Sequence, residues 1–195
     1  MRSRDRQTFD IHGNVHFVTS TVVGFLPIFQ NPDLAAIFVD NLRFYQDRGD
    51  FILLAWVLMP DHFHLVFRRS ENKSVSQILG NLKRMTSRQI TEHLEKSGAS
   101  SLLSDLTNAA LKESTKDSRV WQYRFDSLVI TREETLRQKT DYIHFNPVRR
   151  GLVGEPEDWR YSSAINYSGR GVGLVAVDAS WKCLGYQEVP SGKGS

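Results

Sequence analysis

The chain has 195 residues, enough for one domain with a hydrophobic core, and its mixture of 40% hydrophobic and 24% charged residues is that of a globular protein. Its single cysteine, Cys183, excludes an internal disulfide and fits a reducing compartment. The net charge of +3 permits a polyanionic partner without requiring one. The N-terminus is polar, and no apolar run approaches the roughly 20 residues that cross a bilayer, so we expect a cytoplasmic protein without a membrane partner.

Strand and helix patterns alternate along the first half of the chain. Residues 51–58 are apolar throughout, as in a strand buried on both faces. Asn31 or Asp33 can cap a first helix, and Ser74 can cap a second. In chain order we predict a strand at 14–23, a helix at 33–48, a strand at 51–58, its hairpin partner at 62–69 and a helix at 75–96.

The second half of the chain is less regular. Residues 97–120 have the spacing of a short amphipathic helix, and we interpret them as an insertion. Residues 121–130 end in a strand. We expect one domain over residues 1–168, followed by a loose tail over 169–195, because the tail is rich in glycine and lacks periodicity.

A third helix is expected after this strand. Thr131 and Glu134 match the capping box Ser/Thr-x-x-Glu, which predicts a helix that begins at residue 132. It should end near Asn146, because the residue before a proline, here Pro147, resists the α conformation.

The order strand, helix, strand, strand, helix, strand is that of the split βαβ, or ferredoxin-like, fold. We therefore predict an α+β protein with a four-stranded antiparallel sheet and two helices on one face. The third helix would lie on the sheet's edge or on its other face.

Two histidines stand one residue apart in the apolar stretch "WVLMPDHFHLVF", residues 56–67. Side chains alternate along a strand, so His62 and His64 should share one face while Phe63 and Leu65 point to the core. That geometry suits two ligands of a metal ion. The alternative is that each histidine is an ordinary hydrogen-bonded residue of the core or surface.

A third ligand can come from the third helix. Tyr142 and Asn146 are four residues apart and share a helical face. The Asn146 carboxamide oxygen would complete two nitrogens and one oxygen around Mg²⁺ or Mn²⁺, with open positions for water or a phosphate oxygen. Asp61 and His144 are rival ligands. Asp61 points away from His62 if the strand is already regular there, and His144 faces away from Tyr142.

Tyr142 then becomes a candidate nucleophile. Beside a cation that polarises a phosphodiester, its phenol can attack phosphorus and form a covalent phosphotyrosine. The alternative is a half-buried structural tyrosine. Of the six tyrosines, only Tyr142 lies on an expected helix with a possible ligand one turn away.

These residues resemble the single-tyrosine HUH transposases, and within them the REP-associated tyrosine transposases and their insertion-sequence relatives. His62-Phe63-His64 resembles the HUH motif of two histidines around a hydrophobic residue. The resemblance runs from about residue 14 to 167, and it is also carried by the stretches "WVLMPDHFHLVF", "WQYRF", "DYIHFNPVRRGLV" and "WRYSSAINY".

The resemblance implies a ferredoxin-like catalytic domain in which His62, His64 and Asn146 bind the metal and Tyr142 is the nucleophile. The implied activity is cleavage and rejoining of single-stranded or hairpin DNA through a 5′ phosphotyrosine, in a bacterial cytoplasm, by a monomer or a homodimer. Replication initiators and relaxases tend to carry a lysine where Asn146 stands, which favours the transposase branch. The chain departs from the group in its long 97–120 segment and in Leu128, where histidine or arginine is expected.

Basic and aromatic residues offer candidates for DNA binding. The candidate phosphate contacts are Lys83, Arg84 and Arg88 on the second helix and Arg149 and Arg150 after the tyrosine. For each of them the alternative is a solvated surface residue. Trp121, Tyr123 and Phe125 could stack on bases, although core packing is the better interpretation for Trp121 and Phe125. Arg2, Arg4 and Arg6 could form a basic arm.

Two other functions fit parts of the pattern. A catalytically silent nucleic-acid-binding protein could keep the same fold, but it would have no need of the full set of two histidines, a tyrosine and an asparagine. A small metal-dependent phosphodiesterase would use water and form no adduct, yet the chain carries no cluster of nuclease carboxylates.

Overall fold

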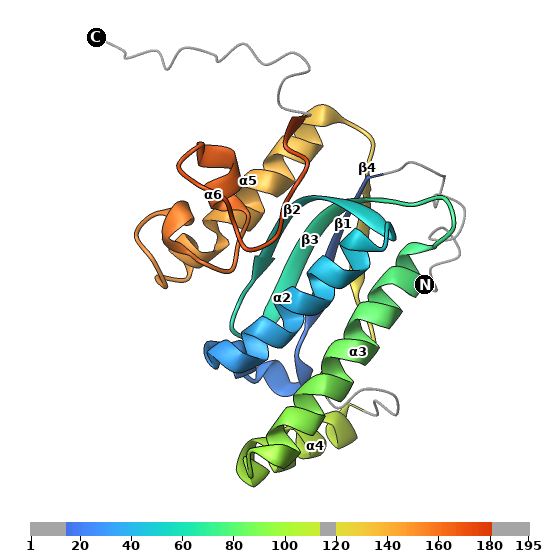
Figure 1. Cartoon of the computed structure of the whole chain (residues 1–195), viewed down its shortest axis with the longest axis vertical. Coiled ribbons are helices and arrows are strands. Elements are labelled where there is room, and N and C mark those ends of the chain that lie inside the picture. Colours follow the sequence, from blue (N-terminus) through green and yellow to red (C-terminus); the bar gives the residue numbers. More distant parts are fainter. Residues whose placement is uncertain (1–14, 114–119, 181–195) are drawn as a thin grey trace.

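The computed structural model describes residues 15–113 and 120–180, and its centre is a four-stranded antiparallel sheet (Figure 1). The strands are β1 (Val15–Thr21), β2 (Phe51–Leu58), β3 (His62–Arg69) and β4 (Asp126–Ile130). Their order across the sheet is β2-β3-β1-β4. This is the ferredoxin-like arrangement that the sequence predicts.

Two helices, α2 (Pro32–Asp47) and α3 (Val75–Lys96), cover one face of the sheet (Figure 1). The side chain of Asn31 accepts a hydrogen bond from the backbone N–H of Asp33 and so caps α2. Ser74 and Gln77 form a reciprocal capping box at the start of α3. The predicted bounds of β2, β3 and α3 agree with the structure, and the capping box accounts for the start of α3.

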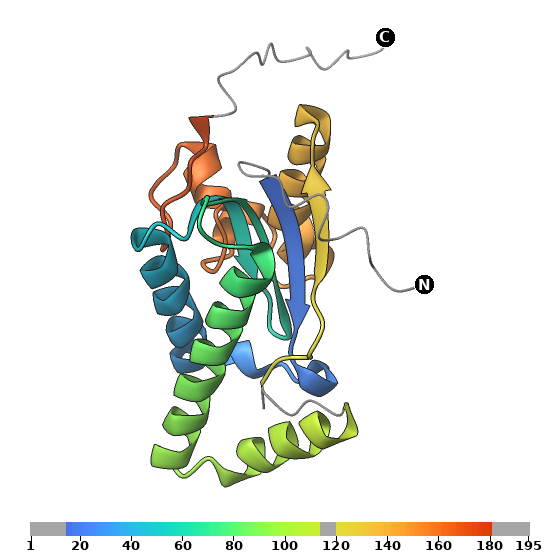
Figure 2. The ribbon, with the colours of Figure 1, turned by 90° about the vertical axis from the view of Figure 1, so that its right-hand side faces the viewer.

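The sheet separates two hydrophobic cores. The larger core lies under α2 and α3 and includes Phe38, Phe63 and Trp121, each fully buried. The smaller core lies on the opposite face, where Val57 and Val66 of the sheet pack with Ile143. Ile143 belongs to the third long helix, α5 (Glu133–Arg149), which Figure 2 shows on the far side of the sheet from α2.

The ends of α5 differ from the sequence prediction. Its N-cap residue is Arg132, and no side chain caps the helix, so the capping box of Thr131 and Glu134 does not form. The helix continues through Pro147, which is buried in the last turn. A proline near a helix end removes only one hydrogen bond, and burial of this turn against the sheet outweighs the preference of the preceding residue for an extended conformation.

The inserted segment contains a helix, as predicted. This helix, α4 (Ser100–Lys112), packs against α3 and against a 3-10 turn, η1 (Val23–Phe25), that follows β1. Figure 2 shows α4 lying across the end of the sheet beside that turn. The rest of the predicted insertion, residues 114–119, lies outside the described residues.

The C-terminal segment is less loose than predicted. After α5 the chain forms two short elements, η3 (Pro156–Asp158) and α6 (Ala164–Ser168). Another short element, η2 (Ile28–Gln30), lies just before α2. Arg43 and Gln46 of α2 donate hydrogen bonds to the carbonyls of Leu174 and Ala176. Val175 is buried in the larger core. Residues 174–176 therefore contact the domain. The domain boundary at residue 168 stays a prediction, and residues 181–195 lie outside the described residues.

Candidate active site

The histidine pair lies on the sheet face that carries α5. His62 and His64 pair in register with Thr21 and Thr19 of β1, and Phe63 and Leu65 point into the larger core. The two imidazole centroids are 4.8 Å apart, and both histidines are buried. The prediction that the histidines share one face is confirmed.

Hydrogen bonds fix the orientation of both imidazole rings. Nδ1 of His62 lies 2.6 Å from Oδ1 of Asp61, and Nδ1 of His64 lies 2.7 Å from Oγ1 of Thr19. Each ring is thereby left with Nε2 for another partner. Within the described part of the chain, Nε2 of His64 is buried and has no hydrogen-bond partner. A buried, unpartnered ring nitrogen is costly unless something binds it.

The histidines form one wall of a cleft of about 270 Å³. Its walls come from β1, η1, β3 and α5, and it is lined by Thr19, Thr21, Phe25, Asp61, His62, His64, Tyr142, Asn146 and Arg150. A larger hollow, of about 580 Å³, lies between α2, β2 and the segment 176–178. That hollow has no histidine or tyrosine in its lining, whereas the smaller cleft holds both histidines and Tyr142.

Helix α5 brings its two predicted functional residues into the cleft together. Tyr142 and Asn146 are one turn apart, and both line it. The ring of Tyr142 meets the His64 ring edge to face at 5.3 Å and remains 40% exposed, so its phenol is accessible. Lys139 and Arg149 place cationic groups 5.7 Å and 5.4 Å from the centre of the Tyr142 ring.

The environment keeps both histidines neutral. Burial lowers the pKa of His62, although Asp61 partly offsets that effect. Burial, together with His62 and Lys139, lowers the pKa of His64 to about 3. A neutral imidazole has a free lone pair, so at pH 7 both rings are in the form that binds a cation.

Comparison with known proteins identifies the family. A sequence model described as "Transposase IS200 like" matches residues 14–146. That range is more than half of the chain and contains both histidines, Tyr142 and Asn146. The chain belongs to the IS200-like transposase family.

Individual relatives agree with this assignment. The chain is 30% identical over 114 residues to a Haemophilus influenzae protein named as a candidate REP-associated tyrosine transposase. It is 26% identical over 122 residues to the REP-associated tyrosine transposase of Escherichia coli K12. The first alignment covers 58% of this chain and the second 63%, and they span only 58% and 59% of the two relatives.

A solved structure described as a REP-associated tyrosine transposase bound to a REP hairpin has the same fold. The TM-score is 0.59, and the match covers 88% of this chain and 90% of the other at 21% identity.

In this member of the IS200-like family, the rival ligands have other partners. Asp61 lies in the turn before β3, where strand alternation does not yet apply, and it lines the cleft instead of facing away. Its second oxygen is 3.5 Å from Nη1 of Arg150. His144 faces away from the cleft, as predicted, with its Nε2 2.8 Å from Oγ of Ser163.

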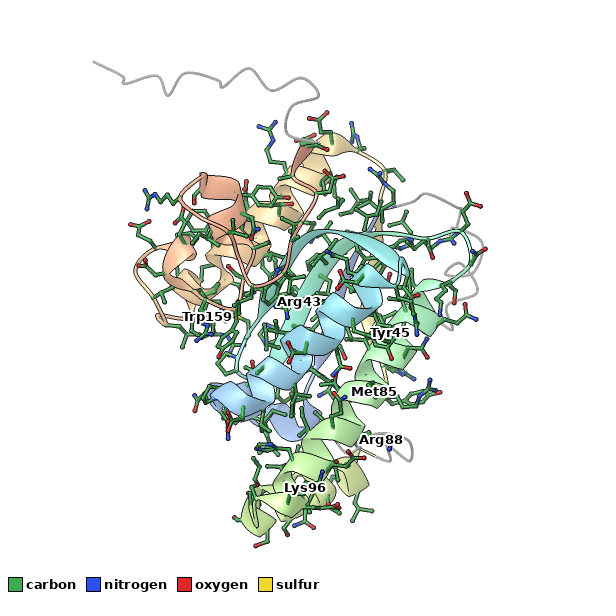
Figure 3. The ribbon with its side chains drawn as sticks, viewed as in Figure 1. Arg43, Tyr45, Met85, Arg88, Lys96 and Trp159 are labelled. Atoms are coloured by element: carbon green, nitrogen blue, oxygen red, sulfur yellow. The ribbon has the colours of Figure 1, made fainter. Side chains whose placement is uncertain are left out.

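The predicted DNA contacts separate into two groups. Arg150 lines the cleft of this family member, and Arg149 donates a hydrogen bond to the backbone carbonyl of Tyr142. Arg84 and Arg88 lie on α3, which packs on the other face of the sheet, and they donate hydrogen bonds to Asn81 and Glu92. Figure 3 labels Arg88 on α3.

Lys83 was predicted as a surface contact, but its side chain is buried. Its ammonium donates to the carbonyls of Gln122 and Tyr123, and burial lowers its pKa to about 8. The spacing of the helix places Lys83 beside exposed arginines but does not reveal that the chain after α4 folds over it. Lys83 is therefore a structural residue that ties α3 to the segment before β4.

Sequence reasoning missed Thr19 and Phe25 in the cleft. Thr19 sits in the predicted first strand, but its position opposite His64 depends on strand register. Phe25 belongs to "GFLP", which reads only as a turn. Of the candidate base-stacking residues, Trp121 is fully buried, Phe125 packs against the larger core and Tyr123 is 73% exposed. Leu128 is exposed on β4 opposite Phe17. The arm of Arg2, Arg4 and Arg6 lies outside the described residues.

Proposed function

We propose that this protein cleaves and rejoins single-stranded DNA, with Tyr142 as the nucleophile and a divalent cation as cofactor. The observation that carries the proposal is the buried, unpartnered Nε2 of His64, which shares one cleft with Tyr142 and Asn146. Membership of the IS200-like family supports the same chemistry.

The cleft residues fit a hard divalent cation. Nε2 of His62, Nε2 of His64 and the carboxamide oxygen of Asn146 would hold Mg²⁺ or Mn²⁺, with the remaining positions open. For this role Nδ1 of His64 must carry the proton and donate it to Thr19, while Nδ1 of His62 donates to Asp61. When bound, the cation would polarise the phosphoryl group and offset its negative charge.

The chain's own residues account for the transfer step. The phenol oxygen of Tyr142 attacks phosphorus, and the bond to the 3′ oxygen breaks. The phenol proton passes to solvent water, and the leaving 3′ oxygen takes a proton from water. The products are a 5′ phosphotyrosine and a free 3′ hydroxyl. The bond energy is kept, so attack by a 3′ hydroxyl on the adduct rejoins the strand. Lys139 and Arg149 beside Tyr142 would attract the phosphate backbone.

We infer hairpin DNA as the substrate class, because the solved structure with the same fold is described with a REP hairpin bound. A single-stranded flank would supply the strand that is cleaved. The silent binding protein and the water-using phosphodiesterase remain the competing functions. They differ from the proposal in one product, the covalent protein–DNA adduct.

A covalent-trapping assay separates the three functions. The protein is incubated with Mn²⁺ and labelled hairpins from the repeats that flank its own gene, and the products are run on a denaturing gel. We expect a labelled protein band that requires metal and disappears in Tyr142→Phe and His64→Ala. Tyr123→Phe is the matched control, because Tyr123 is an exposed tyrosine that does not line the cleft.

The other outcomes of this assay are equally informative. Cleavage without an adduct would favour the water-using phosphodiesterase. Binding on a native gel with neither cleavage nor adduct would favour the silent binding protein.

A further inference from the structure

Phe25 has an unusual backbone and an unusual position. Its φ is +54°, and it is the one non-glycine residue with a positive φ in the described ranges 15–113 and 120–180. An aromatic residue rarely adopts this conformation, because its Cβ crowds the backbone. The side chain is 65% exposed and lines the cleft that holds the two histidines and Tyr142. Strain of this kind persists only where the surrounding structure enforces it.

The surroundings of η1 enforce this conformation. Val22 and Val23 are fully buried before the turn, and the N–H of Phe25 donates to the carbonyl of Val22. The N–H of Gly24 donates to a carboxylate oxygen of Glu113, just after α4, at 3.0 Å. A Cβ at Gly24 would come within 3.0 Å of Cβ of Ala109, so α4 packs directly against the turn.

The exposure of Phe25 is not explained by packing. An isolated exposed apolar side chain is common, but it seldom sits on a strained turn that a neighbouring helix supports. Within the described part of the chain, no other aromatic ring pairs with it, whereas the nearby rings of Phe17, His64 and Tyr142 contact one another. The phenyl ring is therefore accessible to solvent while it lines the cleft.

We propose that Phe25 is a stacking platform for a nucleobase next to the phosphodiester at Tyr142, and that α4 holds the platform in place through Glu113. This inference rests on the proposed function, because it requires a single DNA strand in the cleft. Aromatic platforms suit single strands because every base has a π face. Phe25 would thus contribute affinity and position without reading sequence. Helix α4 and Glu113 thereby gain a role in positioning the substrate.

The test combines removal of the ring with removal of the base. The full chain with Tyr142→Phe binds hairpins with a single-stranded flank, and fluorescence anisotropy gives Kd without any reaction. Each nucleotide of the flank is replaced in turn by an abasic site. At one flank position the abasic substitution should weaken binding by roughly tenfold, which is the usual size of base–aromatic stacking.

Phe25→Ala should weaken binding to the intact hairpin by the same factor and abolish the penalty at that one abasic position. Phe25→Trp should retain the penalty. Phe44→Ala, which removes another exposed phenylalanine, on α2, should change nothing. The proposal would be overturned if Phe25→Ala, made in the Tyr142→Phe parent, bound the intact hairpin as tightly as that parent does. It would also be overturned if every abasic substitution that weakens binding of the parent weakened binding of the Phe25→Ala variant equally.

The support of Phe25 by Glu113 is tested separately, with substitutions of two acidic residues. Glu113→Ala should reproduce part of the loss and have no further effect when Phe25 is already alanine. Asp105→Ala removes the same charge from the exposed side of α4 and should leave Kd unchanged. Equal changes in Kd for Glu113→Ala and Asp105→Ala would show that Glu113 does not hold Phe25 in place. Because these assays measure binding alone, the absence of an adduct in the trapping assay would reject the chemistry without deciding the role of Phe25.

Discussion

At the scale of single residues, Asp61 shows how the turn before β3 sets the chemistry of the strand. Its carboxylate holds Nδ1 of His62 and faces Arg150, so it fixes which nitrogen of His62 faces the cleft. Carboxylate partners of metal-binding histidines typically contribute 10- to 100-fold in metal affinity. Asp61→Asn should therefore weaken Mn²⁺ binding by about that factor in isothermal titration calorimetry.

The control for this prediction is Asp158→Asn, an exposed carboxylate in η3. Its Mn²⁺ affinity should equal that of the unmodified protein. An Asp61→Asn variant with full metal affinity would show that His62 needs no orienting partner.

The depressed pKa of His64 predicts how stability depends on pH in the metal-free protein. The folded state keeps His64 neutral down to about pH 3, whereas the unfolded chain binds a proton near pH 6.5. Between these values the unfolded state holds more protons, so stability falls as pH falls, by up to about 1.4 kcal/mol per pH unit. Urea unfolding at pH 7, 6 and 5 gives the free energy of unfolding. Between pH 7 and pH 5 this free energy should fall less steeply for His64→Gln than for the unmodified protein. Identical slopes would mean that the pKa of His64 is not lowered in the folded protein.

The histidine pair could be predicted at this scale because strand alternation is local in sequence. Thr19 could not, because its contact with His64 exists only once β1 pairs with β3 in one register. Phe25 could not either, because a positive φ at a phenylalanine has no local signal and the packing of α4 against Gly24 is a long-range contact.

At the scale of secondary-structure elements, one face of the sheet carries the larger core and the other face carries the cleft. Helix α3 seals the larger core and buries Lys83. Helix α5 carries Tyr142 and Asn146 to the cleft and places Arg149 beside the Tyr142 ring. Helical spacing predicts which residues share a face, but not which face meets solvent. That is why Lys83 and Arg149 are indistinguishable as candidate DNA contacts in the sequence.

The two basic residues should behave differently with DNA. Lys83→Met should leave Kd for a single-stranded hairpin flank within about twofold, because the buried ammonium meets no phosphate. Arg149→Ala should weaken binding several-fold and reduce the slope of log Kd against log salt by roughly 0.7. The measurement is a salt titration by anisotropy. A reduced salt slope in Lys83→Met would contradict the assignment of Lys83 as structural.

At the scale of the whole molecule, the order of the elements along the sequence predicts the fold. The same order does not predict how the C-terminal part packs against the sheet. Six consecutive patterns predict the ferredoxin-like sheet because that connectivity has few alternatives. In contrast, the N–H of Asp178 bonds the carbonyl of Leu53 on β2, and Ser162 forms a bridge with Val57 of the same strand. Such contacts depend on backbone groups of an edge strand, which carry no sequence signal. In the described ranges 15–113 and 120–180, no helix is long and apolar enough to cross a membrane.

The central claim is that the phenol oxygen of Tyr142 is the nucleophile. Mass spectrometry of the trapped adduct tests this claim most directly. The adduct formed with Mn²⁺ and a hairpin is digested with protease and nuclease, and the modified peptide is sequenced. We predict a nucleotide joined through its 5′ phosphate to Tyr142 alone. A nucleotide on another residue such as Tyr123, or a 3′ phosphate linkage, would contradict the mechanism derived from this cleft.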